Sequence, residues 1–541
     1  MRRFAVVFVL VTLALTAAAG PSVGQQPDTE RNVTGSSVPT ITAVYPNPVA
    51  DGDSGEFVVL SVPSESDLRA YRLGDDEGTV ELPNRTASGR VVLATEPEAV
   101  PESVAGPILE CSGCPELANG GEPLTLRGPN GTLDTAEYAD APEGELFYPG
   151  AERRWRPIGA TDFEPVVAGP GQVQAFTLPD SPDVPREMLA DADERILLAG
   201  YTLTDDRVVD ALVAARERGV ETRVLLDGSP VGGLTTPSAD ALDRLAAANV
   251  SVRLIDGPAA RYRFHHPKYA VVDDEAVVLT ENWKPAGVGG TSSRGWGVVV
   301  DSPAVVDGLV RTFRADAGWR DSTSWERLRE NATFEPASPT VGRYPSRIDP
   351  ESVPVDRVEL LVAPDNAAGR VRELLANASD SIRIVQVSIG DRDDVLLQES
   401  IDAARRGVEV EILLSNTWYT REENRALADQ LRTLADREDL SLSVRLAEPG
   451  GRYEKIHAKG VVVDGDTAIV GSLNWNDNAY RENREVALVL HGEEAGAYFG
   501  GVFERDWEGG ITLVPLGLLA VVVLALSLAG MVARRISFDP G

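Results

Sequence analysis

The stretches HHPKYAVVDDEAVVLTENW (265–283) and IHAKGVVVDGDTAIVGSLNW (456–475) repeat one pattern within the chain. In each, a lysine stands two positions after a histidine, and an aspartate follows after four further residues. Side chains two apart on a strand project from the same face, so each stretch presents an imidazole beside an ammonium. An aspartate-containing turn follows, and the next apolar run is expected to return antiparallel. The pattern predicts two equivalent β-hairpins.

The repetition extends beyond these hairpins. ALVAARERGVETRVLLD (211–227) matches SIDAARRGVEVEILLS (400–415), and each is typical of a helix, a glycine cap and a strand. Matches that keep one order at nearly one offset indicate a tandem duplication. We expect α/β halves at 172–320 and 355–508, joined by a linker at 322–354. Equivalent strands of the two halves then converge on a pseudo-twofold axis, where both histidines and both lysines face one pocket.

Lysine and histidine are scarce in this chain. The lysines are Lys268, Lys284, Lys455 and Lys459, whereas arginine occurs throughout. A compact ammonium contacts a phosphate in a tight pocket where a guanidinium does not fit. The lysines therefore indicate a phosphate site, whereas His265 and His491 are interpreted as incidental.

HPKYAVVD and HAKGVVVD follow the pattern H-x-K-x4-D, and GSLN (471–474) completes the second copy. On these residues, 172–508 resembles the phospholipase D superfamily. The resemblance implies a duplicated α/β/α sandwich and a phosphodiesterase that uses no metal or cofactor and forms a phosphohistidine intermediate. One histidine attacks phosphorus; the other protonates the leaving oxygen and then activates water. His266 and His457 share these roles, with His266 favoured as the nucleophile.

The resemblance also assigns supporting residues. Phosphate oxygens are held by Lys268, Lys459, Asn282, Ser472 and Asn474. Asp273 and Asp464 support the site, and Glu485 orients a catalytic imidazole.

The first copy departs from the family pattern twice. LTENW stands where the second copy has VGSLNW, so Thr280 matches Ser472 only if the missing residue falls before it. SRGWGVVV (293–300) has no glutamate where NREVALVL supplies Glu485. An inactive phosphodiester-binding protein therefore stays open as an alternative.

Residues 40–165 contain short apolar runs split by turn residues, which predicts an all-β, immunoglobulin-like sandwich. The pattern from GEFVVLSV to NGGEPLTLRGPNGTLDTAEY resembles a lamin-tail domain. Cys111 and Cys114 form CSGC, the only cysteines. A local disulfide is favoured over a zinc or redox site, because no second pair would complete a zinc shell.

The two ends of the chain predict its location. Arg2 and Arg3 precede an apolar run and small residues, which indicates a signal peptide at 1–24. Residues 511–533 carry no charge and are long enough for a C-terminal transmembrane helix, with 534–541 as a cytoplasmic tail. These features predict a single-pass cell-membrane protein with an extracellular catalytic domain.

The net charge is −33, with 84 acidic and 51 basic residues. This lysine-poor composition resembles proteins of extreme halophiles, where surface carboxylates maintain solubility. No basic strip with interleaved aromatics indicates a groove for nucleic acid. An anchor directly after the second half would hold the site near lipids, which favours hydrolysis or transfer of phospholipid headgroups. An extracellular nuclease of the same superfamily is the alternative, and no obligate protein partner is evident.

Overall fold

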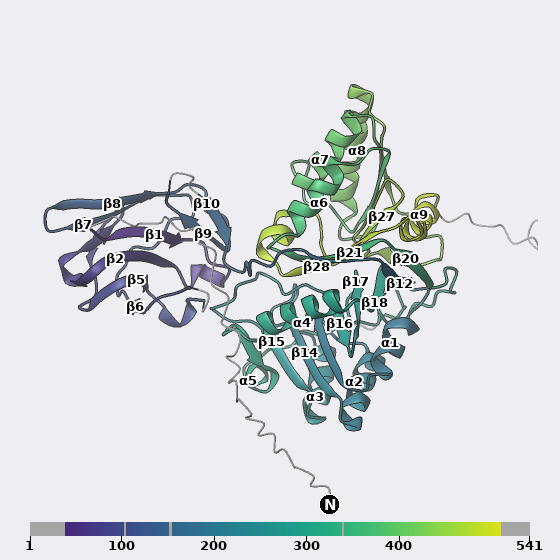
Figure 1. Ribbon diagram of the computed structural model, residues 1–541, viewed down its shortest axis with the longest axis horizontal. Helices are drawn as coiled ribbons and strands as arrows, with labels where there is room; N and C mark the ends of the chain where they lie inside the picture. Colours follow the sequence, from purple (N-terminus) through teal and green to yellow (C-terminus); the bar gives the residue numbers. More distant parts are fainter. Residues whose placement is uncertain (1–37, 102–103, 151–153, 338–339, 510–541) are drawn as a thin grey trace, which may run out of the picture.

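The computed structural model describes residues 38–101, 104–150, 154–337 and 340–509 (Figure 1). The N-terminal part is all-β. One of its sheets has the strand order β10-β9-β1-β2-β5-β6 and the other β4-β3-β7-β8. The strands are β1 (Thr40–Tyr45), β2 (Phe57–Asp67), β3 (Arg72–Gly74), β4 (Thr79–Glu81), β5 (Thr86–Ala94), β6 (Ile108–Glu110), β7 (Pro123–Gly128), β8 (Gly131–Glu137), β9 (Glu145–Tyr148) and β10 (Arg154–Pro157). Short 3₁₀ helices occur at Asp51–Asp53, Leu68–Ala70 and Pro97–Ala99.

Strand β2 shows why this part folds as a sandwich. Its residues alternate between two faces, and both faces are buried near its start. Leu60 and Val62 join the apolar core that also contains Leu73 and Leu124 of the second sheet. Cys111 and Cys114 are joined by a disulfide beside this core.

The first α/β half is built on a sheet with the order β19-β15-β14-β13-β16-β17-β18-β12-β20. Its strands are β12 (Gly171–Leu178), β13 (Arg195–Gly200), β14 (Glu221–Asp227), β15 (Ser251–Ile255), β16 (Tyr269–Val272), β17 (Glu275–Leu279), β18 (Ser293–Val300), β19 (Ser322–Ser324) and β20 (Glu351–Val355). Its helices are α1 (Asp183–Ala190), α2 (Asp206–Arg218), α3 (Thr236–Ala247), α4 (Pro303–Ala317) and α5 (Trp325–Arg329). The segment predicted as a linker thus contributes β19, α5 and β20.

The second half has the order β11-β21-β28-β27-β26-β22-β23-β24. Its strands are β11 (Val166–Ala168), β21 (Arg357–Ala363), β22 (Ser381–Gln386), β23 (Glu409–Leu414), β24 (Leu442–Leu446), β26 (Gly460–Val463), β27 (Thr467–Gly471) and β28 (Glu485–His491), and β25 (Lys455–Ile456) pairs with β18 of the first half. Its helices are α6 (Ala367–Ala376), α7 (Val395–Arg405), α8 (Arg421–Glu438) and α9 (Glu493–Trp507), with a π-helical turn at Asn478–Glu482.

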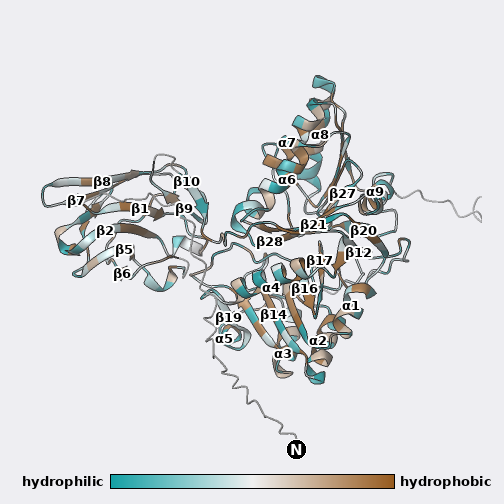
Figure 2. Ribbon diagram, in the orientation of Figure 1, coloured by the Kyte–Doolittle hydropathy of each residue, from teal (hydrophilic) through white to brown (hydrophobic). Residues whose placement is uncertain are grey.

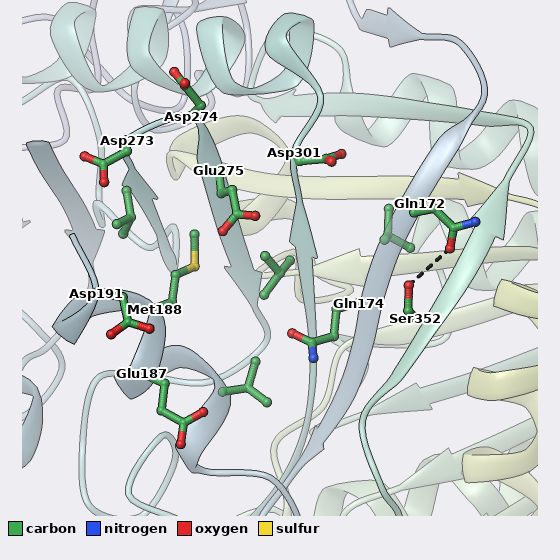
Figure 3. Close-up of a pocket in the computed structure, with 14 residues that line it drawn as sticks. Gln172, Gln174, Glu187, Met188, Asp191, Asp273, Asp274, Glu275, Asp301 and Ser352 are labelled. Atoms are coloured by element: carbon green, nitrogen blue, oxygen red, sulfur yellow. Dashed lines mark hydrogen bonds between the residues drawn. The ribbon is translucent and has the colours of Figure 1, made fainter. Parts of the chain in front are cut away.

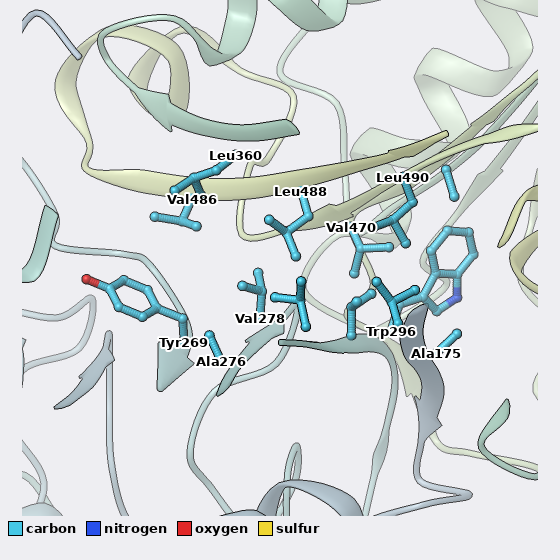
Figure 4. Close-up of a cluster of buried hydrophobic side chains, with 14 of the residues drawn as sticks. Ala175, Tyr269, Ala276, Val278, Trp296, Leu360, Val470, Val486, Leu488 and Leu490 are labelled. Carbon is cyan, nitrogen blue, oxygen red and sulfur yellow. The ribbon is translucent and has the colours of Figure 1, made fainter. Parts of the chain in front are cut away.

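The two sheets face each other across one apolar core. Val278 and Trp296 of the first half approach Val470 and Leu488 of the second (Figure 4). Apolar residues of α4 and α9 complete this layer, whereas α1–α3 and α6–α8 cover the outer faces (Figure 1). Brown interior strands and teal outward helix faces show the same layering in Figure 2. The halves also exchange edge strands, since β11 pairs with β21 and β20 with β12.

Two buried polar clusters repeat the pseudo-twofold relation. Arg294, the second residue of β18, and Arg484, directly before β28, occupy equivalent positions, and both are almost completely buried. Arg294 contacts Asp180 and Asp506 and lies over the ring of Tyr453. Arg484 contacts Asp365 and Asp316 and lies over the ring of Tyr262. These clusters fix the strands β18 and β28 where they enter the site.

The predicted membrane anchor is contradicted. Across the described residues, none of the helices combines the length and the apolar character that crossing a bilayer requires. The longest described helix, α8, has 18 residues and is charged along its outer face, which hydrocarbon would not tolerate. We therefore withdraw the C-terminal transmembrane helix and the single-pass membrane localisation with an extracellular domain. The segments on which they were placed, 1–24, 511–533 and 534–541, lie outside the described residues.

Candidate active site

The two hairpins have the predicted form, and their registers resolve the departure of the first copy. Tyr269 pairs with Val278 in one hairpin, and Gly460 pairs with Val470 in the other. The missing residue falls in the turn, which is Asp273–Asp274 in the first copy and 464–466 in the second. Thr280 therefore occupies the position of Ser472.

The hydroxyls at these two positions make the same hydrogen bond. Thr280 Oγ1 accepts from the backbone N–H of Trp296 at 2.9 Å, and Ser472 Oγ accepts from that of Val486 at 3.0 Å. Threonine thus reproduces the structural contact of the serine, and the altered LTENW segment keeps the loop geometry of the second copy.

Each candidate catalytic histidine contacts a carboxylate from the other half. His266 Nδ1 lies 2.9 Å from both carboxylate oxygens of Glu485. His457 Nδ1 lies 3.2 Å from Glu281 Oε2. Both carboxylates are buried, at 0% and 2% exposure. The crossed pairs use Nδ1 of each ring, so Nε2 of His266 has no hydrogen-bond partner among the described residues, whereas Nε2 of His457 lies 3.3 Å from Lys459 Nζ.

Glu281 is a residue that the sequence argument missed. The strand registers make Gly295 the counterpart of Glu485, and Leu473 the counterpart of Glu281. A Cβ atom on Gly295 would lie 2.2 Å from Glu281 Cγ, so the glutamate side chain fills the space that a side chain at 295 would need. The carboxylate has moved from the strand to the preceding loop. The signal was the E of LTENW, a segment in which the sequence showed only a missing residue relative to VGSLNW.

The motif lysines lie among the imidazoles and are buried, with Lys268 at 0% and Lys459 at 3% exposure. Lys268 Nζ donates to His266 O at 2.6 Å. Lys459 Nζ lies 3.1 Å from His457 Nδ1 and donates to His457 O at 2.8 Å. Burial, followed by the charges of Lys459, Lys268 and His266, lowers the pKa of His457. The two imidazoles and two ammoniums therefore share one electrostatic environment.

The two histidine–carboxylate pairs differ in protonation. Burial lowers the pKa of His266 to about 4, whereas burial of Glu485 is outweighed by His266 and Lys268, which lower the pKa of that carboxyl. In the other pair, burial raises the pKa of Glu281 to about 8. Near neutral pH the His266 pair consists of imidazole and carboxylate, while the His457 pair retains one additional proton. Groups whose environments separate their pKa values in this way suit the roles of base and acid.

The other predicted residues divide between the site and its support. Asn282 and Asn474 precede the buried Trp283 and Trp475, and the buried amide oxygen of Asn282 has no hydrogen-bond partner among the described residues.

Asp273 and Asp464 lie at the far ends of their strands from the histidines. Each has a positive φ and accepts backbone N–H groups, from 193–195 and 379–381 respectively. Burial would raise the pKa values of these aspartates, but the hydrogen bonds lower them. They hold the hairpin turn against the neighbouring strand.

A cavity of about 540 Å³ lies beside the first hairpin turn (Figure 3). Asp273 and Asp274 line it together with the acidic side chains of Glu187, Asp191 and Glu275. Neither motif histidine nor motif lysine contributes to its wall. An acidic wall repels a phosphodiester, so we assign this cavity no part in the site.

Comparisons with known proteins agree with the duplicated geometry. The family described as "Cardiolipin synthase, PLD-like domain" matches residues 186–317 and again 371–507. A probable phospholipase D of Caenorhabditis elegans is 26% identical over 342 residues, which are 56% of this chain but only 59% of that protein. Cardiolipin synthase A of Citrobacter koseri is 27% identical over 360 residues, covering 62% of this chain and 68% of the relative.

A phosphatidylserine synthase structure from Haemophilus influenzae has a TM-score of 0.46 at 14% identity, covering 61% of this chain and 84% of that one. The family matches begin at residue 186, so the lamin-tail resemblance of 40–165 stays a prediction. The two family matches coincide with the two halves that carry the histidines. These two halves of the chain belong to the phospholipase D superfamily.

Proposed function

We propose that the chain is a phosphodiesterase that hydrolyses or transfers phospholipid headgroups through a phosphohistidine intermediate. The observation that carries the proposal is the pair of crossed histidine–carboxylate contacts, which lie beside two buried ammoniums. The relatives named for phospholipase D and cardiolipin synthase support a phospholipid as the substrate.

In the first step, Nε2 of His266 attacks phosphorus while Nδ1–H stays hydrogen-bonded to Glu485. The bond from phosphorus to the leaving oxygen breaks, and that oxygen takes the proton held by the His457–Glu281 pair. The imidazole bound to phosphorus gains positive charge, which the Glu485 carboxylate stabilises across 2.9 Å. Lys268 and Lys459 stabilise the phosphoryl oxygens.

In the second step, His457 takes a proton from water or from an acceptor alcohol. The oxygen attacks phosphorus, the bond to His266 breaks, and the electron pair returns to Nε2. Water yields a phosphomonoester and an alcohol yields a new phosphodiester. The proton taken by His457 restores the starting state of its pair.

The test offers the purified full chain two substrates in parallel: phosphatidylglycerol–phosphatidylcholine vesicles and single-stranded DNA. We expect released headgroup or transferred phosphatidyl product from the vesicles, and full activity in the presence of a chelator. Cleavage of DNA without release of any headgroup would overturn the lipid assignment in favour of the nuclease. Activity that is lost with chelator and restored by zinc or magnesium would overturn the mechanism.

A further inference from the structure

The four lysines of the chain gather at one site, but only two belong to the repeated motif. Lys455 stands two residues before His457 and begins the short strand β25. Lys284 directly follows the buried Trp283, in the loop that leads from Asn282 to strand β18.

The backbone brings these two additional lysines together across the halves. Lys455 of β25 pairs with Ser293 at the start of β18. The loop before β18 folds back on Lys284, whose carbonyl accepts from the N–H groups of Gly287 and Gly289 at 3.0 Å. The charge of Lys455 reaches Lys284 and lowers its pKa, after the larger effect of burial. We call Lys284 and Lys455 the cationic wall.

The opposite wall carries no such pair. By the equivalence of the two copies, Phe264 takes the place of Lys455 and Asn476 that of Lys284. Phe264 packs edge-on against Tyr201, which also contacts the ring of His266. The duplicated site is therefore cationic beside His457 and aromatic beside His266.

Among the described residues, no carboxylate forms an ion pair with the cationic wall. Neither Lys284 nor Lys455 makes a side-chain hydrogen bond or ion pair with any residue that the structure describes, and Lys455 Nζ lies 5.6 Å from the ring centroid of Tyr419. The charge of Lys455 also acts on Glu281, whose own contact is His457. The two half-buried lysines interact electrostatically, so their like charges repel, and a bound anion relieves that repulsion.

We propose that Lys284 and Lys455 bind a second phosphate group of the substrate, carried by the alcohol that leaves or enters beside His457. The inference rests on the proposed function, because His457 is placed there as the acid for that alcohol. The ligand class is an alcohol bearing its own phosphate mono- or diester. Such a group occurs in diphosphate glycerolipids and in oligonucleotides.

The test compares substrates that differ by one phosphate. The lipid arm uses cardiolipin and phosphatidylglycerol in mixed micelles, and the nucleotide arm uses the thymidine dinucleotide with and without its 5′-phosphate. The variants are Lys284→Met and Lys455→Met, which remove the charge but keep an extended side chain. Arg425→Met on α8 is the matched control, because it removes an exposed cation outside the site.

We expect each lysine variant to lower the preference in kcat/KM for the two-phosphate substrate by about tenfold, the scale of one charge-assisted hydrogen bond. Arg425→Met should keep the preference of the wild type. The arm in which the preference occurs identifies the source of the phosphate. An equal loss with one-phosphate and two-phosphate substrates, or an unchanged preference, would overturn the proposal.

A binding experiment separates this proposal from the proposed function. Calorimetric titration of the full chain with pyrophosphate and with inorganic phosphate needs no turnover. We expect pyrophosphate to bind about tenfold more tightly than phosphate to the wild type, and this ratio to approach one in both lysine variants. If the chain cleaves no phosphodiester but keeps this affinity ratio, the proposed phosphodiesterase function is refuted and the second phosphate site is supported. Equal affinities in the wild type would refute the subsite.

Discussion

The first half offers two positions, 281 in the loop and 295 in the strand, from which a carboxylate can contact His457. Glu281→Leu gives this loop the leucine of the second copy, and Gly295→Glu gives its strand the glutamate. The second half already accommodates both residues, as Leu473 and Glu485, beside an equivalent hairpin. The double variant Glu281→Leu/Gly295→Glu should therefore rebuild the orienting contact from the strand.

The expected magnitudes follow from the contacts. His457 and Glu281 are 3.2 Å apart and buried, and a hydrogen bond to a charged group contributes about 1.5–3 kcal/mol, or roughly 10- to 100-fold in rate. Glu281→Leu should lose that factor. Gly295→Glu alone places a Cβ atom 2.2 Å from Glu281 Cγ, so it should destabilise the fold by about 1–3 kcal/mol. The double variant should recover about half or more of the logarithmic loss of Glu281→Leu, because neighbouring substitutions couple.

The assay measures kcat/KM for a dialkyl phosphodiester with the full chain, and the unfolding midpoint in urea is measured for each variant. Glu281→Leu should keep a midpoint near that of the wild type, so that its loss reports chemistry. A double variant that folds normally yet is no more active than Glu281→Leu would refute the idea that a carboxylate at either position serves His457.

Three further predictions concern proton transfer and stability. The plot of kcat/KM against pH should be bell-shaped, falling below about pH 4 as His266 gains a proton and above about pH 8 as the His457–Glu281 pair loses one. Glu281→Gln should move only the alkaline limb, to lower pH. A shift of the acidic limb instead would reverse our assignment of the two pairs. The leaving group 4-nitrophenolate needs no proton. His457→Ala should therefore impair cleavage of bis(4-nitrophenyl) phosphate far less than cleavage of a dialkyl phosphodiester, whereas His266→Ala should impair both. The reverse pattern would make His457 the nucleophile. Arg484→Met removes the arginine that pairs with the buried Asp316 and should lower the free energy of unfolding in urea by about 3–5 kcal/mol. The double variant Arg484→Met/Asp316→Asn should lose less. Equal losses in the two variants would show that the ion pair itself contributes little.

The sequence predicted the parts of the fold that depend on local pattern. A strand, an aspartate turn and a returning strand follow from period-two apolar runs, and both hairpins form where HPKYAVVD and HAKGVVVD placed them. The exchange of β11 and β20 between the sheets could not be read in this way. Both are short edge strands whose partners lie far away in the sequence, and pairing at that distance is decided by the assembled core.

The missed Glu281 has a different physical cause. A position-by-position comparison of the two copies assumes that residues at equivalent positions have the same role. The contact to His457 depends on where a carboxylate arrives in space, and the loop at 281 reaches the same volume as a side chain at 295. Gly295 was the informative residue, because a glycine in a buried strand indicates close approach of another group.

The two halves differ in where the carboxylate beside each histidine is placed, and this difference bears on which histidine attacks phosphorus and which donates a proton. Two identical halves could share one proton between their histidines, but neither histidine would be assigned in advance as the neutral imidazole or as the proton donor. Burial within one half and the carboxylate from the other determine each state, so a change in either half alters both pairs. Glu485 on the strand keeps His266 beside an ionised carboxylate, and Glu281 on the loop keeps a proton beside His457. The altered first motif is therefore better explained as the source of the difference between acid and nucleophile than as the remains of a lost site.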